Sequence, residues 1–329
     1  SQNDAALISA RQAQQVQGDA ARALAVQARI YLNAGRIDEA RSAAAQAIGM
    51  ASNDADALSM QASIAHATGD AAGALRDYGR ALAAKPEYLE ARIARAGLLL
   101  DLKRDAEAWT DLEYLKKNHP FDARAAYLRS VYFSRKGDQV KARESLAEVA
   151  AILDAVSPEF LASRPQLQLL GGLSHFGLNQ FERAKTFLGN YIKLRPREAG
   201  ARKLLGAIYL SERQYGPAIA MLEAAQRAFP EDARVMAMLG AAHMGKGNHA
   251  KAAQLMEQAA NAQDTPDIQT GLGMSLIGTG REEAGFNALA RAYKQDPVRS
   301  QAGAALAMQH LKRGESKQAI SIVQEMLKR

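Results

Sequence analysis

Six histidines are the side chains best suited to metal binding or acid–base chemistry in this sequence, and they are His66, His119, His175, His243, His249 and His310. No two of them stand four residues apart, which is the spacing that lets one helix face present two imidazoles to a zinc ion. His243 and His249 flank a predicted turn, with no acidic residue at ligand spacing. We therefore expect solvated or core-edge histidines and no metal site.

The motifs of the common enzyme classes are also missing. There is no Gly-x-Ser-x-Gly elbow, no phosphate loop ending in Gly-Lys-Ser/Thr, and no cysteine for a thiol nucleophile, disulfide or zinc cluster. Gly271-Leu272-Gly273 is similar to the beginning of a dinucleotide loop, but its third glycine is absent and it lies within a predicted helix. Carboxylate pairs such as Asp38-Glu39 stand at predicted helix starts, where they favour the helix dipole. The sequence predicts no catalytic residue and no cofactor.

Composition and charge limit the classes of partner. Hydrophobic residues make up 48% of the 329 residues and aromatic residues only 6%, so that Ala and Leu dominate, as suits closely packed helices. The formal charge is +7, but basic residues are interspersed in runs no longer than Lys116-Lys117, so we do not expect nucleic acid as a partner. No apolar stretch approaches the roughly 18 residues of a membrane span. Membrane association is expected only through an anchor or domain outside this sequence.

The elements that would position any site follow a repeat of 34 residues. One series of small residues consists of Ala40, Ala74, Ala108, Ala142, Ala184, Ala218, Ala252, Gly285 and Ala319. A second, in phase with it, consists of Ala28, Ala62, Ala96, Ser130, Gly172, Gly206, Gly240, Gly273 and Ala307. Glycines recur at Gly35, Gly69, Gly137, Gly247, Gly280 and Gly314, and prolines at Pro86, Pro120, Pro196, Pro230 and Pro297.

Each series has a physical reason in a stack of helix pairs. A helix pair cannot bury its apolar face alone, so neighbouring pairs must stack. Small residues let two helix backbones approach closely, whereas a bulky side chain would separate them. Glycine ends the first helix because it adopts a left-handed backbone without a Cβ clash. Proline ends the second helix because it lacks an N–H group.

These residues resemble the tetratricopeptide repeat family. The resemblance is carried by Leu205-Gly206 with Tyr209, Ala218, Leu222 and Pro230, and by Ala62, Gly69, Ala74, Tyr78, Ala81 and Pro86. It implies an all-α, right-handed superhelix of about nine helix-turn-helix repeats. They can be written at about 21–54, 55–88, 89–122, 123–164, 165–198, 199–232, 233–265, 266–299 and 300–329.

Two irregularities interrupt the array. Residues 1–20 are interpreted as the second helix of a truncated preceding repeat, and the last repeat as incomplete, so we expect a segment of a longer protein. Repeats one to four occupy 21–164 and repeats five to nine occupy 165–329. The step from Ala142 to Ala184 is 42 residues, which places an insertion near 151–164. We expect a longer helix over 144–155 and then a short turn with Ser157 as N-cap and Pro158 at its first position; a local bend, a knob or a tolerated loop extension would all fit.

The resemblance implies that first helices line a concave groove for a protein or peptide partner. Reading one face of each first helix gives the candidate residues Arg22, Arg29, Arg124, Tyr127, Arg135, Leu169, Leu173, Phe176, Lys203, Arg234, Met244, Met274, Ile277, Met308 and Leu311. This groove would be basic towards its N-terminal half and apolar and methionine-rich towards its C-terminal half, which suits an adaptable surface. The alternatives are that these side chains pack on the neighbouring second helix, or that another element of the full protein fills the groove. Co-chaperones of the family clamp a terminal carboxylate with Lys and Asn, but the equivalent positions are Ala25, Arg29, Ser59 and Ser63, so that role is not expected.

Two later stretches resemble a narrower group, the repeat lipoproteins that accompany exosortase and its PEP-CTERM sorting system. They run over 181–206, including Phe181-Glu182-Arg183-Ala184 and Leu194-Arg195-Pro196, and from Gly271 to Gly285. The resemblance implies an exported, lipid-anchored periplasmic scaffold for exopolysaccharide assembly, export or protein sorting. A cytosolic adaptor and a carbohydrate-contacting array remain alternatives, although a single tryptophan, Trp109, makes aromatic platforms sparse.

Overall fold

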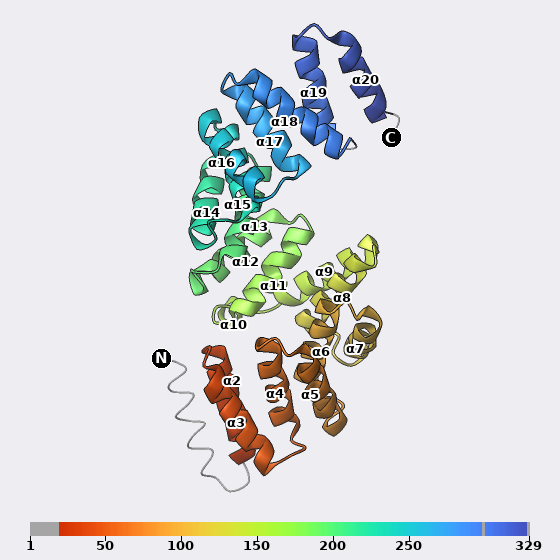
Figure 1. The fold of residues 1–329 in the computed structure, drawn as a ribbon. Coiled ribbons are helices and arrows are strands. Elements are labelled where there is room, and N and C mark those ends of the chain that lie inside the picture. The colour runs from red at the N-terminus through yellow and green to blue at the C-terminus, as the bar shows by residue number, and fades with distance from the viewer. Residues whose placement is uncertain (1–19, 298–299, 328–329) are drawn as a thin grey trace. The chain divides into compact units, whose positions relative to one another are not determined.

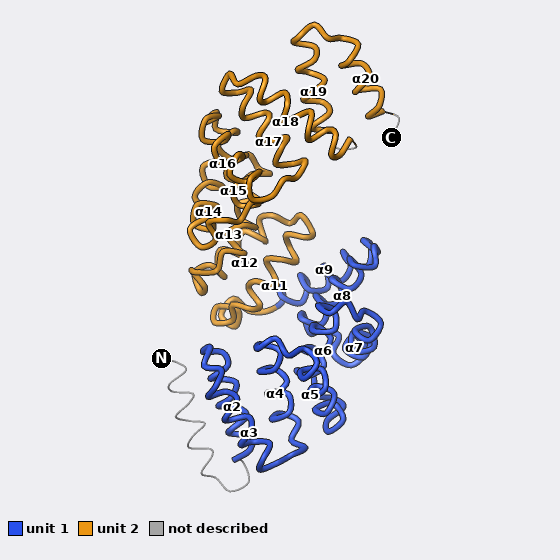
Figure 2. Tube along the Cα trace, viewed as in Figure 1, with its two compact units in different colours: residues 1–155 blue, residues 156–329 orange. Residues whose placement is uncertain are grey.

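The structure is a computed structural model, and it describes residues 20–297 and 300–327. Every regular element in these ranges is a helix, as the composition predicted. The helix expected within residues 1–20 lies outside the described residues, apart from residue 20 itself. The chain divides after Ala155 into two compact units, which are described separately below (Figure 2).

The first unit contains four consecutive helix pairs in its described part (Figure 1). The first helices of these pairs are α2 (Ala20–Asn33), α4 (Ala55–Ala67), α6 (Leu89–Asp101) and α8 (Ala123–Arg135). The second helices are α3 (Ile37–Met50), α5 (Ala71–Ala84), α7 (Asp105–Asn118) and α9 (Gln139–Asp154).

The second unit contains a short helix and five further pairs. The short helix is α10 (Pro158–Leu161). The first helices are α11 (Pro165–Gly177), α13 (Ala199–Ser211), α15 (Ala233–Gly245), α17 (Pro266–Gly278) and α19 (Ser300–Lys312). The second helices are α12 (Phe181–Leu194), α14 (Tyr215–Ala228), α16 (His249–Ala262), α18 (Glu282–Gln295) and α20 (Ser316–Leu327). The expected all-α stack of about nine helix pairs is confirmed.

The region around 151–164 holds a longer second helix and an extra turn. Helix α9 has 16 residues, whereas α7 and α12 have 14. Ser157 caps α10, since its hydroxyl accepts a hydrogen bond from the Phe160 amide at 3.3 Å, and Pro158 follows at the first helical position. Both predictions for these two residues are confirmed. Leu161 anchors the turn to α11, because it is buried and its carbonyl accepts a hydrogen bond from Gln168.

The turn within each pair closes in the same way throughout the described residues. The amide after each turn residue donates to the carbonyl five positions earlier, as Asp70 does to Ala65 at 2.8 Å and Gln214 to Tyr209 at 2.7 Å. This pattern is the Schellman motif, and it needs one residue with positive φ. All six glycines predicted at these turns adopt positive φ. Lys103, Asn179 and Arg213 hold the same conformation at the three remaining turns, with φ near 60°.

Close contacts between the two helices of a pair explain the series of small residues. A Cβ atom added to Gly206 would lie 2.6 Å from the Leu222 side chain, and one added to Gly172 would lie 2.5 Å from Leu188. At Gly273 the new carbon would lie 2.7 Å from the Leu289 side chain and also 2.8 Å from a backbone atom, the Gly285 carbonyl oxygen. Glycine is therefore required here for backbone approach.

First and second helices take different places within each unit. Successive first helices contact each other, as α2 does α4 and α13 does α15. Successive second helices make no such contact among the described residues, and α3 and α5 are one example. Within a unit the first helices therefore pack together on one side, which we call the inner face, while the second helices stand apart on the other, outer side.

The glycine contacts lead to a first prediction. Gly273→Ala should lower the free energy of unfolding by about 1–3 kcal/mol, the usual cost of overpacking, because the Gly285 carbonyl cannot move aside without shifting α18. Gly189→Ala in α12 is the matched control, since nothing lies within 4 Å of its added Cβ. The control should be neutral or stabilising by about 0.5–1 kcal/mol. Urea denaturation measures both, and equal effects would contradict the assignment.

The turns lead to a second prediction. Arg213→Gly should raise stability by up to about 1 kcal/mol, because relief of the left-handed backbone at φ 59° exceeds the entropy that glycine gains on unfolding. The reverse change at an equivalent turn, Gly247→Arg, should lower stability by a similar amount. Thermal unfolding midpoints of the two variants should move in opposite directions; movement in the same direction would show that the turn residue is not what limits stability.

Candidate protein-binding face

Two predicted arginines lie together at the beginning of the inner face in the first unit. Arg22 and Arg29 are both exposed on α2, and they line a cavity of about 120 Å³ with Asp56 and Met60 of α4 and Tyr88, which precedes α6. Neither arginine has an ion-pair partner among the described residues. These two guanidinium groups are thus available to an incoming acidic or polar group.

Asp56 is held by a neighbouring repeat. The Tyr88 hydroxyl donates a hydrogen bond of 2.5 Å to its Oδ1 atom. Burial, followed by this hydrogen bond and the charge of Asp56, raises the pKa of Tyr88 well above its ordinary value. Tyr88 therefore remains a neutral donor, and the floor of the cavity stays in one arrangement beside the two arginines.

Arg124, a third predicted groove residue, is already paired. Its guanidinium group donates to both carboxylate oxygens of Glu90, at 2.7 and 3.0 Å, and to Asp122 at 2.7 Å. Together these hydrogen bonds and charges outweigh burial and raise the pKa of Arg124. The pair joins α6 to the next first helix, α8, so Arg124 links repeats.

The other two predictions in the first unit also serve the fold. Arg135 donates to the Leu100 carbonyl at the end of α6 and lies 3.9 Å from Asp105. Tyr127 is half-buried, and burial raises the pKa of its hydroxyl. The expected basic groove is therefore restricted to Arg22 and Arg29, and the rest of this face is charge-balanced.

In the second unit, Lys203 repeats the pairing role of Arg124. Its ammonium group donates to Asp232 at 2.6 Å, and Asp232 also caps α15 by accepting from the Val235 amide at 3.1 Å. Arg234 is exposed beside this pair and has no ion-pair partner among the described residues. The positive charge available on this face is that of Arg234.

Several predicted apolar residues pack within the repeats. Leu169 and Phe176 lie against the core of α12 and α13, and the Phe176 ring is 6.1 Å from that of Phe181. Ile277 packs on Gly285, where an added Cβ would meet its Cγ1 atom at 2.6 Å. Ile277 therefore fills the space between α17 and α18, as the alternative reading of the sequence allowed.

The remaining apolar residues are progressively more accessible. Leu173 and Met244 are half-buried, and the Ser275 hydroxyl contacts the Met244 sulfur at 3.7 Å. Met274 packs on the core of α18 to α20. Met308 and Leu311 of α19 are exposed by 60% and 57%. These two side chains form the apolar surface that the second unit offers on its first helices.

Comparison with known proteins supports this architecture. Two sequence profiles described as tetratricopeptide repeat match residues 25–88 and 209–274, one in each unit. The chain is a tetratricopeptide-repeat array. A search among curated proteins finds no match.

Solved structures align with this chain at low sequence identity, and one of them has a TM-score above 0.5. A crystal structure of the APC/C hetero-tetramer Cut9–Hcn1 aligns over 94% of this chain with a TM-score of 0.57 and 16% identity. This chain spans 60% of the length of that one. Yeast Tom70 aligns over 94% of this chain and 92% of its own, with 15% identity and a TM-score of 0.44. A tetratricopeptide repeat protein from Parabacteroides merdae ATCC 43184 has 15% identity and a TM-score of 0.46, covering 79% of this chain and all of its own.

The tetratricopeptide repeat is generally a scaffold that binds protein or peptide partners and does not catalyse reactions. Among the described residues no group of three or more His, Asp or Glu side chains could hold a metal ion. None of the described helices is both long and apolar enough to cross a membrane.

Sequence reasoning missed Asp56 and Tyr88 beside the arginines. Arg22, Asp56, Glu90 and Arg124 are successive members of one column with a step of 34 residues. Reading charge along this column would have identified Asp56 and paired Glu90 with Arg124. The role of Tyr88 lies outside that column and depends on the path of the chain between α5 and α6.

Asp232 leads to a prediction about pH. Burial raises its pKa, but the hydrogen bonds from Lys203 and from the Val235 amide outweigh burial and lower it. A lowered pKa in the folded chain stabilises the fold above the unfolded value of about 3.9, and this contribution is lost as pH falls through the folded pKa. Asp232→Asn, which retains a capping oxygen, should lower the urea midpoint at pH 7 and have less effect near pH 3. The matched control is the exposed neighbour Glu231→Gln; an equal loss for Asp232→Asn at both pH values would contradict the charge assignment.

Proposed function

We propose that this repeat array is a non-catalytic scaffold in the bacterial envelope, where it binds a protein partner during exopolysaccharide export or assembly or the associated sorting of PEP-CTERM proteins. The observation that carries the binding role is the division of inner-face side chains into two groups. Arg124, Lys203 and Ile277 are committed to contacts within the fold. Arg22, Arg29, Arg234, Met308 and Leu311 are exposed.

The exposed groups of each unit suit a different kind of partner side chain. Arg22 and Arg29 of the first unit would pair with carboxylates, and their hydrogen bonds would be strengthened by the charge on both groups. Met308 and Leu311 of the second unit would receive apolar side chains, with methionine adapting to their shape.

The envelope assignment is supported by sequence resemblance alone. The stretches over 181–206 and from Gly271 to Gly285 are similar to repeat lipoproteins that accompany exosortase. A periplasmic location would place the inner face among the proteins that move a polysaccharide to the outer membrane. The partner would then be a protein of that machinery, and the lipid anchor would belong to a segment outside this sequence.

Reversing two charges on the inner face tests the binding role. Arg22→Glu with Arg29→Glu should weaken partner binding about tenfold, since two exposed ion pairs of up to about 1 kcal/mol each become repulsive. The measurement is photo-crosslinking in the source bacterium from a probe placed at residue 33, followed by titration of the captured partner. Lys116→Glu with Lys193→Glu is the matched control, because it reverses the same charge on exposed second-helix positions.

A separate measurement tests the envelope assignment. Cells lacking the chain should secrete less exopolysaccharide, the wild-type chain should restore secretion, and the Arg22/Arg29 variant should not. The chain should fractionate with the periplasm or the membrane. Normal secretion in the deletion strain would overturn the exopolysaccharide role, while crosslinking that is unchanged by the charge reversals would overturn the binding face.

A further inference from the structure

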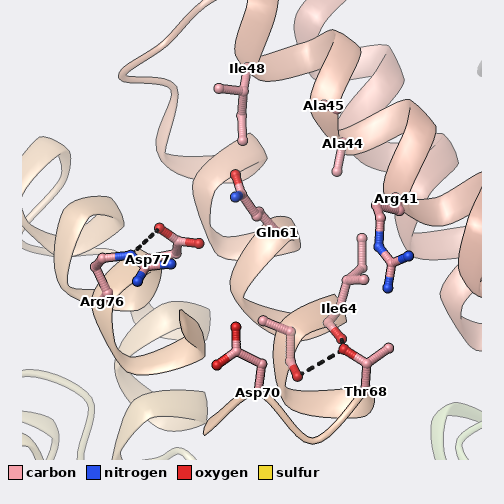
Figure 3. Close-up of a pocket in the computed structure, with 11 residues that line it drawn as sticks. Arg41, Ala44, Ala45, Ile48, Gln61, Ile64, Thr68, Asp70, Arg76 and Asp77 are labelled. Carbon is pink, nitrogen blue, oxygen red and sulfur yellow. Dashed lines mark hydrogen bonds and ion pairs between the residues drawn. The ribbon is translucent and has the colours of Figure 1, made fainter. Parts of the chain in front are cut away.

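A cavity in the first unit lies on the opposite side from the candidate face. It is a groove of about 520 Å³ between the second helices α3 and α5, with α4 as its floor. This volume falls within the range of about 300–1,000 Å³ typical of small-molecule sites. Figure 3 shows Arg41 on one side, Arg76 and Asp77 on the other, and Gln61 between them. Ala44, Ile48, Ile64 and Ala65 supply its apolar lining.

The same groove recurs one repeat later in a partly filled form. Between α5 and α7 a cavity of about 290 Å³ is lined by Leu75 and Leu99, which lie 34 residues after Arg41 and Ala65. The two cavities are therefore equivalent sites in successive repeats. Leu99, which replaces the smaller Ala65, accompanies the smaller volume.

In the next repeat, aromatic residues occupy the two positions equivalent to Leu75 and Leu99. Trp109 and Phe133 follow Leu75 and Leu99 by 34 residues, and their ring centroids are 5.4 Å apart in an edge-to-face arrangement. Trp109 also stacks on Tyr132 with centroids at 4.8 Å. At this member of the series, aromatic rings of α7 and α8 therefore pack against each other at the positions that leave the first groove open.

The rim of the open groove carries two exposed arginines that are held only by long ion pairs. The side chains of Arg41 and Arg76 are 61% and 67% exposed, and each lies 3.7 Å from its nearest carboxylate oxygen, on Asp38 and Asp77. That separation is too long for a hydrogen bond. The two carboxylates of the groove are engaged, since Asp70 caps α5 through the Gly73 amide at 2.8 Å and Asp77 accepts from Arg80 at 3.3 Å.

We propose that the groove between α3 and α5 binds an aromatic side chain of a partner polypeptide, flanked by acidic residues that pair with Arg41 and Arg76. The ring occupies the space that Trp109 and Phe133 fill two repeats later. The flanking carboxylates take hydrogen bonds from the two arginines. This site is separate from the inner face, so the array can hold a second polypeptide segment while the first helices are occupied.

The probe for the test is the peptide acetyl-Asp-Gly-Trp-Gly-Asp-amide, titrated into the complete chain by saturation-transfer NMR. An aromatic ring with two exposed ion pairs should give a Kd of about 1 mM. Leu in place of Trp should weaken binding about tenfold, because an aliphatic group loses the ring contacts. Lys in place of both Asp residues should abolish detectable binding.

Variants that introduce the residues of later repeats at the equivalent positions of this groove locate the site. Arg41→Trp with Ala65→Phe reproduces the pair Trp109 and Phe133 and should remove binding. Ala65→Leu alone introduces one of the two leucines of the second groove and should weaken binding about threefold. Arg41→Gln with Arg76→Gln should weaken it about fivefold. Lys193→Gln in the second unit is the control for charge and should have no effect. Circular dichroism establishes that each variant is folded.

Failure of this proposal is distinguishable from failure of the inner-face function. Arg22→Glu with Arg29→Glu should leave peptide binding unchanged, since neither residue lines this groove. A wild-type chain that does not bind the peptide overturns the proposal, as does undiminished binding by a folded Ala65→Leu or Arg41→Trp/Ala65→Phe variant. Loss of binding in the inner-face variant would also overturn it, because the peptide would then occupy the first-helix face.

Discussion

The close approach of the two helices within each pair is the constraint on which the rest of the structure depends. It occurs where a small first-helix residue meets a large side chain 16 residues later, as Gly206 meets Leu222 and Gly240 meets Met256. A spacing of 16 residues is possible only if the chain reverses in a tight turn of constant length. The Schellman hydrogen bond and one residue with positive φ form that turn. The contact between the two helices and the geometry of the turn therefore depend on each other.

Once the helices of a pair are in contact, the residue that precedes the small residue on the first helix decides the chemistry between repeats. In the first unit this column reads Gln61, Arg95 and Arg129, whereas Leu205 and Leu239 occupy it in the second. Arg95 is held by the buried Asp111, with N–O distances of 2.7 and 2.8 Å. Buried pairs contribute little net stability but impose a specific geometry. The first unit therefore has polar contacts and open grooves where the second has an aliphatic core.

The features that could be predicted from the sequence are those that depend on residues close in the chain. Turn glycines, the Ser157 cap and the repeat phase all follow from local backbone requirements. The candidate face was predicted less well, because a helical period of 3.6 residues identifies a stripe without deciding which neighbour covers it. Ile277 belongs to such a stripe, but it packs on Gly285 of its own partner helix. The pairing of Arg124 with Glu90 depends on two stacked repeats, so it is found by comparing charges at a step of 34 residues and not by reading one helix.

A repeat protein offers an internal standard for deciding which side chains are free to act on a partner. Each position has equivalents one step of 34 residues away, so the fold shows what normally satisfies it. Glu90 satisfies Arg124, but no described carboxylate pairs with its equivalent, Arg22. Aromatic rings fill the outer groove at Trp109, but the equivalent Arg41 leaves it open. Because equivalent repeats share one backbone geometry, the differences between them arise from their side chains. Binding capacity is therefore concentrated at residues that lack the contact made by the equivalent residues of other repeats.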